Sequence, residues 1–361
     1  MKTIVLTGGG TLGHALPHLA IYPYLKNSFD DFYYIGSSGG AEEPVMSKTF
    51  KYYGITTAKL KRYFSFDNLT ILSRVLKGIR EAEKILTKLK PDVVFSKGGY
   101  VSVPVIFAAK KLKIPVVAHE SDYTVGLANK LVSKKCASVL TSFSDTAKNG
   151  KNYLFTGPPV REFNIDKPPA LKRFGFSGHK PVLLILGGSM GSLTINNAIT
   201  GLLPDLLKKY DVLHVGVNDI KKEKIKGYFP IKYLDDISLA YSACDVAVSR
   251  SGAGASFELM NLKIPTLFIP LSKKASRGDQ ILNARYFLKK GMCNILYEEN
   301  LNSSFLLDKI DKTYAEKNYY INNMKKCENL CGNRRIAEVL CKYGEQKPSA
   351  ARSPSAILNT L

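Results

Sequence analysis

Short runs of β-branched and other apolar residues alternate along the chain with longer segments whose apolar residues recur at helical spacing. Runs of four or five such residues are typical of strands that are buried on both faces of a parallel sheet. In the first half, strands are predicted at Thr3–Thr7, Phe32–Ile35, Asp92–Ser96, Pro115–Ala118 and Val139–Ser142. Between them, helices are predicted over Leu69–Lys88 and Val103–Leu112. Strand–helix alternation of this kind indicates an α/β fold.

The alternation begins again in the second half of the chain. Its predicted strands are Pro181–Leu186, Val212–Val215, Val246–Ser249 and Thr266–Ile269. We therefore predict two Rossmann-like, doubly wound domains, residues 1–157 and 181–343, facing each other across a cleft. Residues 158–180 contain four prolines and several charges, which indicates a linker, and the Ser-, Ala- and Pro-rich residues 344–361 indicate a disordered tail. Ligands of such sheets bind beyond the carboxyl ends of the strands.

Charge narrows the kinds of partner. The 361 residues include 52 Lys and Arg against 30 Asp and Glu, a formal charge of +22. An excess of this size suits nucleic acid, an anionic membrane face or a nucleotide, although a lysine-rich proteome would give the same excess. No nucleic-acid-binding motif accompanies the charge, so we expect no nucleic acid partner, and the sequence identifies no protein partner.

Other features of the sequence argue against several classes of protein. No apolar run approaches the roughly 18 residues that span a bilayer, and no secretory signal is found, so a cytoplasmic location is expected. The six cysteines form no C-x-x-C pair, which argues against a zinc ribbon or a disulfide scaffold. No P-loop motif occurs, and no Asp-x-Asp that could clamp a metal–diphosphate.

Four glycine-rich turns follow predicted strands, and two lie in each half. They are Gly8–His14, Lys97–Tyr100, Gly187–Gly191 and Arg250–Gly254. Such turns let the backbone approach a ligand, and the helix that follows directs free N–H groups at an anion. The first turn matches G-x-G-x-x-G, but the second predicted strand ends without the carboxylate that a dinucleotide ribose requires. The four turns together favour a bridging ligand with phosphates over NAD, although each alone could be a tight turn.

Several polar residues beside these turns could carry chemistry. His14 opens a helix, where the imidazole is kept neutral and able to accept a proton, but it could also cap the helix or contact phosphate. Glu258 could accept hydrogen bonds from the vicinal hydroxyls of a ribose, or simply favour the helix dipole. Gln280 and Asn283 share one helix face and could recognise sugar hydroxyls, or be ordinary surface residues.

Six motifs in order bring these features together. They are Gly9-Gly10-Thr11-x-Gly13-His14, His119-Glu120-Ser121-Asp122 with Gly126-Leu127-Ala128-Asn129-Lys130, Gly157-Pro158-Pro159-Val160-Arg161, Gly187-Gly188-Ser189-x-Gly191, Arg250-Ser251-Gly252-Ala253 with Glu258, and Asp279-Gln280-x-x-Asn283-Ala284. In this combination the chain resembles the MurG family of N-acetylglucosaminyltransferases over roughly residues 2–343.

The resemblance implies an inverting transferase with the GT-B glycosyltransferase fold. Its donor would be UDP-N-acetylglucosamine (UDP-GlcNAc), bound mainly by the C-terminal domain. Its acceptor would be the undecaprenyl-linked lipid I, which becomes lipid II in peptidoglycan synthesis. No metal or other cofactor would be obligatory, because fixed N–H donors and Arg161 would stabilise the charge on the departing UDP. The alternatives are a diacylglycerol glycosyltransferase and a non-catalytic nucleotide-sugar-binding membrane subunit.

The resemblance also assigns roles to residues. His14 would take the proton of the muramyl hydroxyl, with Glu120 as a rival base. The donor-binding residues would be Thr11, Leu12, Gly13, Arg161, Gly188, Ser189, Gly191, Leu234 (by the uracil), Glu258 (at the ribose), Gln280 and Asn283. The acceptor-facing residues would be Gly98, Gly99, Tyr100, Asp122 and Asn129, beside Glu120. Two residues depart from the family pattern. Leu12 stands where the family usually has Gly or Ala, and Asp122 stands where many members have Asn.

A basic segment interleaved with apolar residues lies in the N-terminal half. Between Lys48 and Lys90 there are 11 Lys and Arg against three acidic residues. The expected membrane-facing residues are Lys61, Arg62, Phe66, Leu69, Leu72, Arg74, Val75 and Lys77. An apolar patch rimmed by cations suits the anionic cytoplasmic leaflet, so a peripheral position on the cell membrane is predicted. The alternative is a helix with an ordinary buried stripe and a solvated face.

Overall fold

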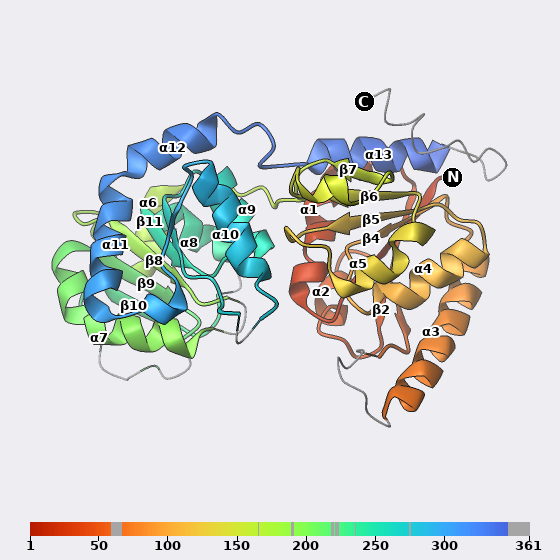
Figure 1. The fold of residues 1–361 in the computed structure, drawn as a ribbon, viewed down its shortest axis with the longest axis horizontal. Helices are drawn as coiled ribbons and strands as arrows, with labels where there is room; N and C mark the ends of the chain where they lie inside the picture. Colours follow the sequence, from red (N-terminus) through yellow and green to blue (C-terminus); the bar gives the residue numbers. More distant parts are fainter. Residues whose placement is uncertain are drawn as a thin grey trace. The chain divides into compact units, whose positions relative to one another are not determined.

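The computed structural model describes residues 1–58, 67–164, 166–188, 191–217, 220, 224–234, 236–273 and 276–345. The chain forms two compact units (Figure 1). The first contains Met1–Arg161 together with the chain from Cys331 onward, and the second contains Glu162–Leu330. Each unit is a parallel sheet covered by helices.

The described part of the first unit contains a seven-stranded parallel sheet in the order β3-β2-β1-β4-β5-β6-β7. Its strands are β1 (Thr3–Thr7), β2 (Asp31–Ser37), β3 (Lys51–Ile55), β4 (Val93–Ser96), β5 (Val116–Glu120), β6 (Ser138–Thr141) and β7 (Tyr153–Phe155). Ile4 of β1 pairs with Phe32 of β2 on one side and with Val93 of β4 on the other. The strand order therefore reverses between β1 and β4, which is the switch point where ligands of open α/β sheets bind.

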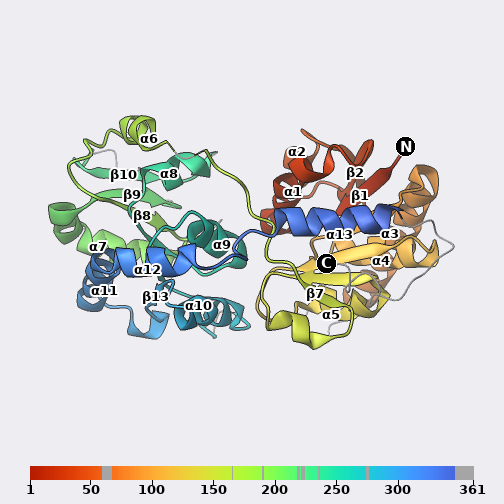
Figure 2. The same ribbon diagram turned by 90° about the horizontal axis from the view of Figure 1, so that it is seen from above.

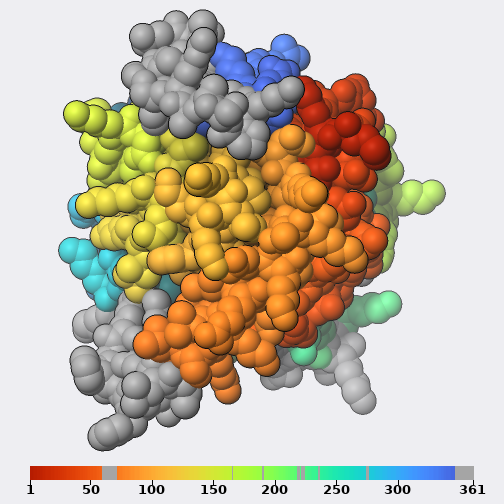
Figure 3. All heavy atoms as spheres, turned by 90° about the vertical axis from the view of Figure 1, so that its right-hand side faces the viewer, coloured from red at the N-terminus to blue at the C-terminus, as the bar shows by residue number. Residues whose placement is uncertain are grey.

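Helices cover both faces of this sheet. They are α1 (Pro17–Leu25), α2 (Glu43–Met46), α3 (Asp67–Leu89), α4 (Ser102–Lys111), α5 (Leu127–Val132) and α13 (Asn333–Glu345). Because successive strand side chains point to opposite faces, Ile4 and Leu6 join the core under α1 and α13, which lie side by side (Figure 2). Val5 joins the core under α3 and α4, which pack together on the other face (Figure 3).

The second unit repeats this architecture. In its described part, a six-stranded parallel sheet has the order β10-β9-β8-β11-β12-β13. The strands are β8 (Val182–Leu186), β9 (Asp211–Val215), β10 (Tyr228–Ile231), β11 (Val246–Ser249), β12 (Thr266–Phe268) and β13 (Asn294–Ile295). The helices are α6 (Lys167–Phe174), α7 (Leu193–Lys209), α8 (Ile237–Ala243), α9 (Ala253–Asn261), α10 (Asp279–Lys289), α11 (Ser303–Ala315) and α12 (Lys317–Lys325). Helices α7 and α11 bury one face of the sheet.

The prediction of two Rossmann-like α/β domains is confirmed. Each predicted strand corresponds to an observed strand, and its first and last residues differ from the observed ones by at most two positions. The strands that the pattern did not predict are β3, β7, β10 and β13, the edge strands of the two sheets. Edge strands are only partly covered, so their sequences lack the continuous apolar run on which the prediction depends.

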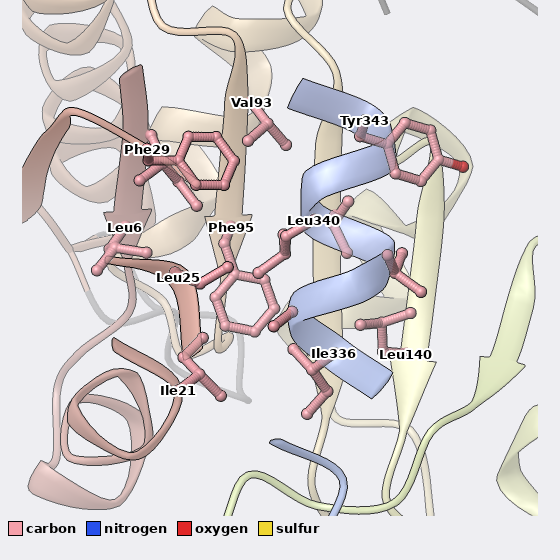
Figure 4. Packing of buried hydrophobic residues seen from close by; sticks show 14 of the residues in the cluster. Leu6, Ile21, Leu25, Phe29, Val93, Phe95, Leu140, Ile336, Leu340 and Tyr343 are labelled. Atoms are coloured by element: carbon pink, nitrogen blue, oxygen red, sulfur yellow. The ribbon is translucent and has the colours of Figure 1, made fainter. Parts of the chain in front are cut away.

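The predicted C-terminal domain includes the segment that forms α13, whereas in the structure this helix packs in the first unit. Ile336, Leu340 and Tyr343 lie on one face of α13 and pack into the core that includes Phe95 (Figure 4). The Asn333 side chain fixes the start of the helix, since it accepts from Val160 N–H (3.0 Å) and donates to Val160 O (2.7 Å). An apolar stripe shows that a helix packs, but not against which sheet.

The predicted linker over residues 158–180 contains a helix, α6. Pro168 and Pro169 lie in the first turn of this helix, where the missing N–H would have no intrahelical partner. Phe174, 5% exposed, contacts the ring of Phe229 edge-on and holds α6 to the second unit. The prolines therefore mark the start of a helix as well as a connection.

Two further predictions concern the C-terminal tail and membrane-spanning helices. Residues 344 and 345 complete α13, and the rest of the predicted disordered tail lies outside the described residues. Within the described ranges, no helix combines the length and the apolar character that crossing a bilayer demands.

Candidate functional site

Three loops meet at the carboxyl edge of the first sheet, after the neighbouring strands β1, β4 and β5. The β1 loop leads into a short 3₁₀ turn, Leu12–His14, and then into α1. Gly99, in the β4 loop, has φ +79°, and a Cβ there would clash with Gly9 O and lie 3.2 Å from His14 Cδ2. The two glycine turns therefore pack backbone to backbone, and this contact places His14 beside the β4 loop.

His14 has a defined hydrogen-bonding pattern. Its Nδ1 lies 3.1 Å from Lys97 O. A carbonyl oxygen can only accept, so Nδ1 carries the hydrogen and the lone pair of a neutral ring lies on Nε2. Burial and the nearby Lys97 charge lower the pKa of His14 below its usual value. The ring is therefore neutral near pH 7, and its Nε2 can accept a proton.

Lys97 is a buried cation that the sequence did not single out as a functional residue. It is 1% exposed, and its Nζ lies 2.7 Å from His119 Nδ1 and 2.6 Å from Ser121 Oγ. Burial lowers the pKa of Lys97 to about 7, against the opposing effect of nearby Glu120 and Asp122. Lysine is common on protein surfaces, and nothing in the sequence shows that this one is internal.

Glu120 uses both carboxylate oxygens within the protein. Oε1 accepts from Asp122 N–H (3.1 Å), and Oε2 accepts from Gly126 N–H (2.8 Å) and from Asn129 Nδ2 (2.9 Å). Burial raises the pKa of Glu120, while these hydrogen bonds oppose the rise. The carboxylate thus shapes the loop that follows β5, and its contacts favour His14 over Glu120 as the base.

Asn129 and Tyr100 were expected to face an acceptor. Asn129 is only 4% exposed. Its Nδ2 donates to Glu120 Oε2 and also to His119 O (3.3 Å), so this side chain holds the end of β5 from the buried side of the loop. Tyr100 is half-buried, and its ring packs directly against Gly10, where φ is +85°. Gly98 has φ +84° and lies beside Asn129.

Glu42 is a buried carboxylate that the sequence did not reveal. It precedes α2, yet its Oε1 accepts from Ser37 N–H (2.9 Å) and Ser37 Oγ (2.6 Å) at the end of β2. Its Oε2 accepts from Gly10 N–H in the first glycine turn (3.3 Å). The sequence has no acidic residue at the end of β2, whereas the fold brings one there from the segment before α2. Glu42 thus links the end of β2 to the first glycine turn.

In the second unit, loops after β8, β11 and β12 are held together by Arg250. This side chain is 7% exposed; Nη2 donates to Ser192 Oγ (2.8 Å) and Nη1 donates to Ile269 O (3.1 Å). Nη2 also forms an ion pair with Glu298 (2.5 Å). Burial acts to raise the pKa of Glu298, but Arg250 and the Ser272 amide lower it overall. The sequence did not predict Glu298, because it lies more than 40 residues along the chain from the nearest glycine turn.

The first turn of α7 is built to approach a ligand closely. Ser192 caps the helix by accepting from Ile195 N–H (3.3 Å). Gly188 and Gly191 have φ +92° and +74°, and a Cβ at Gly191 would clash with Gly216 O. The 17-residue helix α7 begins here, and the N-terminus of a helix favours the binding of an anion. Ser189 lies outside the described residues.

Glu258, Gln280 and Asn283 lie beside these loops on α9 and α10. Glu258 is 8% exposed and accepts from Tyr241 Oη (2.9 Å). Asn283 Nδ2 donates to Ser251 O (3.1 Å), and Gln280 Oε1 accepts from Leu271 N–H (3.0 Å). The two amides therefore tie the loops after β11 and β12 to α10, and their roles toward a sugar stay predictions.

The remaining predicted residues are placed as follows. Thr11 and Gly13 are exposed, whereas Leu12, Asp122, Arg161 and Leu234 are half-buried. Lys61, Arg62 and Phe66 lie outside the described residues, as does the side chain of Leu69. Across the described ranges, no three His, Cys, Asp or Glu side chains come close enough together to hold a metal ion.

Comparison with known proteins identifies the class. Residues 4–141 match the glycosyltransferase family 28 N-terminal domain, and residues 182–340 match the glycosyltransferase family 28 C-terminal domain. The chain belongs to glycosyltransferase family 28.

Curated relatives are more specific. The chain is 44% identical over 352 residues to the UDP-N-acetylglucosamine–N-acetylmuramyl-(pentapeptide) pyrophosphoryl-undecaprenol N-acetylglucosamine transferase of Clostridium botulinum strain Langeland, with 95% of this chain and 99% of that protein covered. The transferase of the same name from Clostridium kluyveri is 44% identical over 95% of this chain and 100% of its own length. The predicted resemblance is confirmed.

Solved structures agree on the fold. Acinetobacter baumannii MurG matches with a TM-score of 0.71 at 19% identity, covering 95% of this chain and 100% of that one. The glycotransferase of kitacinnamycin matches with a TM-score of 0.73 at 14% identity, covering 94% and 98%. These likenesses confirm the predicted GT-B architecture.

Proposed function

We propose that this chain transfers N-acetylglucosamine from UDP-GlcNAc to the muramyl hydroxyl of undecaprenyl-pyrophosphoryl-N-acetylmuramyl-pentapeptide. The names of its curated relatives support this donor and this acceptor. The observation that carries the chemistry is the bond between His14 Nδ1 and Lys97 O, which leaves a basic Nε2 at the switch point of the first sheet. The product is lipid II, a precursor of peptidoglycan.

On the acceptor side, His14 acts as the general base. The muramyl hydroxyl oxygen attacks the anomeric carbon from the face opposite UDP, so the new C–O bond forms with inversion as the bond to the diphosphate breaks. The hydroxyl proton passes to His14 Nε2, which is unprotonated because burial and Lys97 lower its pKa. A positioned base of this kind contributes about 10²–10⁴-fold in rate.

On the donor side, the second unit binds UDP. The diphosphate binds at the N-terminus of α7 near Gly188 and Gly191, and Ser189 and Arg161 keep the diphosphate-binding roles that the resemblance assigns to them. Leu234 lies by the uracil, Glu258 accepts from the ribose, and Gln280 with Asn283 recognise the sugar. Amide dipoles and a guanidinium stabilise the leaving phosphate without an obligatory metal.

Replacing Glu258 by glutamine tests the donor assignment. A hydrogen bond to a charged group contributes about 1.5–3 kcal/mol, so UDP affinity is expected to fall roughly tenfold or more. Titration calorimetry with UDP measures this directly. Glu299→Gln, an exposed carboxylate of the same unit, is the matched control and should bind UDP as the parent does. An unaltered affinity in Glu258→Gln would remove the ribose role.

We further propose that α3 docks the protein on the anionic cytoplasmic face of the cell membrane. Ala82 and Leu86 form the buried stripe of this helix, whereas Leu72 and Leu76 are 57% and 46% exposed. These two leucines are therefore not part of the buried stripe. Arg74 and Lys77 are exposed on the same turns, and Phe107, which is also exposed, belongs to the neighbouring helix α4. An apolar surface rimmed by cations suits such a leaflet.

The double variant Leu72→Asp/Leu76→Asp tests this surface. Each leucine that enters the interface contributes about 1.5–3 kcal/mol, so partition onto phosphatidylglycerol vesicles is expected to fall at least about tenfold. Co-sedimentation with the vesicles is the measurement. Leu288→Asp, at a 44% exposed leucine of the second unit, should leave partition unchanged. Equal sedimentation of parent and double variant would exclude this surface.

A transfer assay separates the proposed function from its alternatives. Purified protein is incubated with UDP-GlcNAc and either a lipid I analogue or diacylglycerol. Turnover with the lipid I analogue supports the proposal. Transfer to diacylglycerol would indicate the related glycolipid enzyme, and tight donor binding without turnover would indicate a non-catalytic subunit.

A further inference from the structure

The side-chain ammonium and the main-chain oxygen of Lys97 have different hydrogen-bond partners. Its ammonium is buried, and the partners within hydrogen-bond distance are the neutral groups His119 Nδ1 and Ser121 Oγ. Its main-chain oxygen accepts from His14 Nδ1. Burying a cation against neutral partners is unfavourable, so this lysine lowers the free energy of unfolding.

The partners of the ammonium are themselves fixed. His119 Nε2 lies 3.2 Å from Gly157 O, so this ring carries its hydrogen on Nε2 and offers the Nδ1 lone pair to Lys97. Burial and the Lys97 charge hold the pKa of His119 well below its usual value, which keeps the ring neutral. The lysine side chain thus links the end of β4 to β5 through two defined acceptors.

The backbone after Lys97 holds the carbonyl only in part. Gly98 and Gly99 both have positive φ, and the Gly98 N–H, which belongs to the same peptide unit as Lys97 O, donates to Ser96 Oγ (3.1 Å). On the other side, Lys97 N–H donates to Thr7 O (2.9 Å) at the end of β1. The carbonyl that contacts His14 is therefore held by a backbone hydrogen bond on each side of Lys97 and by the anchored side chain.

We propose that Lys97 is a positioning residue for His14: its side chain, anchored on His119 and Ser121, holds its own carbonyl against His14 Nδ1 and so fixes the tautomer with a free Nε2. This inference rests on the proposed role of His14 as the base. Holding a catalytic histidine in the correct tautomer and orientation by a fixed acceptor at Nδ1 has a large effect on rate in other enzymes.

The charge of Lys97 reinforces this geometry. The titratable groups that face His14 are Lys97 after β4, Glu42 before α2, Asp122 in the β5 loop and His18 on α1. Burial and Lys97 lower the pKa of His14, and Asp122 and Glu42 act to raise it. Because the pKa of Lys97 is about 7, the lysine is charged over the acidic range in which His14 titrates. Removing the charge should therefore raise the pKa of His14.

Lys97→Met tests the proposal, because methionine has a similar length but neither charge nor donors. We expect kcat to fall about 10–100-fold, and the acidic limb of the kcat/KM profile to move up by roughly half to one pH unit. UDP affinity should not change, since the donor binds to the second unit. Lys110→Met, at an exposed lysine of α4, is the control. A purely structural role would lower stability without moving the acidic limb.

Ser121→Ala provides a milder second variant that retains the charge. It removes one anchor of the ammonium, so kcat should fall severalfold while the acidic limb stays in place. In ¹⁵N-histidine spectra, His14 should show a single Nδ1–H tautomer in the parent chain and tautomer exchange in either variant. Unchanged kcat and spectra in both variants, with His14→Ala inactive, would overturn the role of Lys97 alone. Full activity of His14→Ala would instead overturn the proposed base.

Discussion

Replacing His14 by alanine is expected to lower kcat by about 10²–10⁴-fold, the range that a positioned general base supplies. The affinity for UDP should change little, because the proposed donor contacts lie mainly in the second unit. The physical reason is that Nε2 takes a proton as the acceptor oxygen attacks, whereas ground-state binding does not depend on this transfer. Steady-state kinetics with saturating UDP-GlcNAc and a lipid I analogue measures kcat, and calorimetry measures UDP affinity.

The matched control is His179→Ala, which removes an exposed histidine of the second unit and should leave both quantities unchanged. If His14→Ala retained the parent kcat, the base would be another group, and Glu120 would be next to test. If kcat were unchanged but UDP affinity fell, His14 would instead contact the phosphates.

Gly99→Ala is expected to have the second large effect. A Cβ there would clash with Gly9 O, a backbone atom that cannot move away as a flexible side chain could, and φ is +79°. The left-handed conformation alone costs about 1–2 kcal/mol for a residue with a Cβ. With the clash added, we expect the free energy of unfolding to fall by more than about 2 kcal/mol. Separation of the β1 and β4 loops should also lower kcat.

Gly98→Ala isolates the contribution of the clash. Gly98 has φ +84°, but a Cβ there would meet Asn129 at 3.5 Å or more, an ordinary contact. This variant should show only the cost of the backbone conformation, about 1–2 kcal/mol. Urea unfolding followed by circular dichroism gives both values. Equal losses in the two variants would mean that the contact between Gly99 and Gly9 does not hold the loops together.

The sheet cores could be predicted because local pattern and burial coincide there. Strands such as β1 and β8 are buried on every residue, so their sequences are continuous apolar runs. The glycine turns follow directly from these strands. The positive φ of Gly10, Gly98, Gly99, Gly188 and Gly191 shows that three of the four turns require glycine, whereas Gly252 in the fourth turn has φ −65° and open space where a Cβ would lie. The carboxyl edges could therefore be located before any side-chain geometry was known.

What failed depends on contacts between segments far apart in the sequence. Glu42 reaches the end of β2 from the next element, and Lys97 is internal only because His119 and Ser121 come to it from β5 and its loop. Helix α13 crosses back to the first sheet after the whole second unit. No local pattern encodes such partners. In the same way, the sequence did not show that the Glu120 carboxylate accepts hydrogen bonds from Asp122 N–H and Gly126 N–H in the loop after β5, and its role as a rival base stays a prediction.

A crystal structure of the protein with an unreactive UDP-GlcNAc analogue and a soluble lipid I analogue tests the central claim most directly. The distance that decides is the one between His14 Nε2 and the muramyl hydroxyl oxygen. The account predicts about 2.6–3.2 Å, hydrogen-bonding distance for a general base, with Nδ1 still on Lys97 O. A hydroxyl bound instead to a Glu120 oxygen, with His14 Nε2 turned toward phosphate, would contradict it.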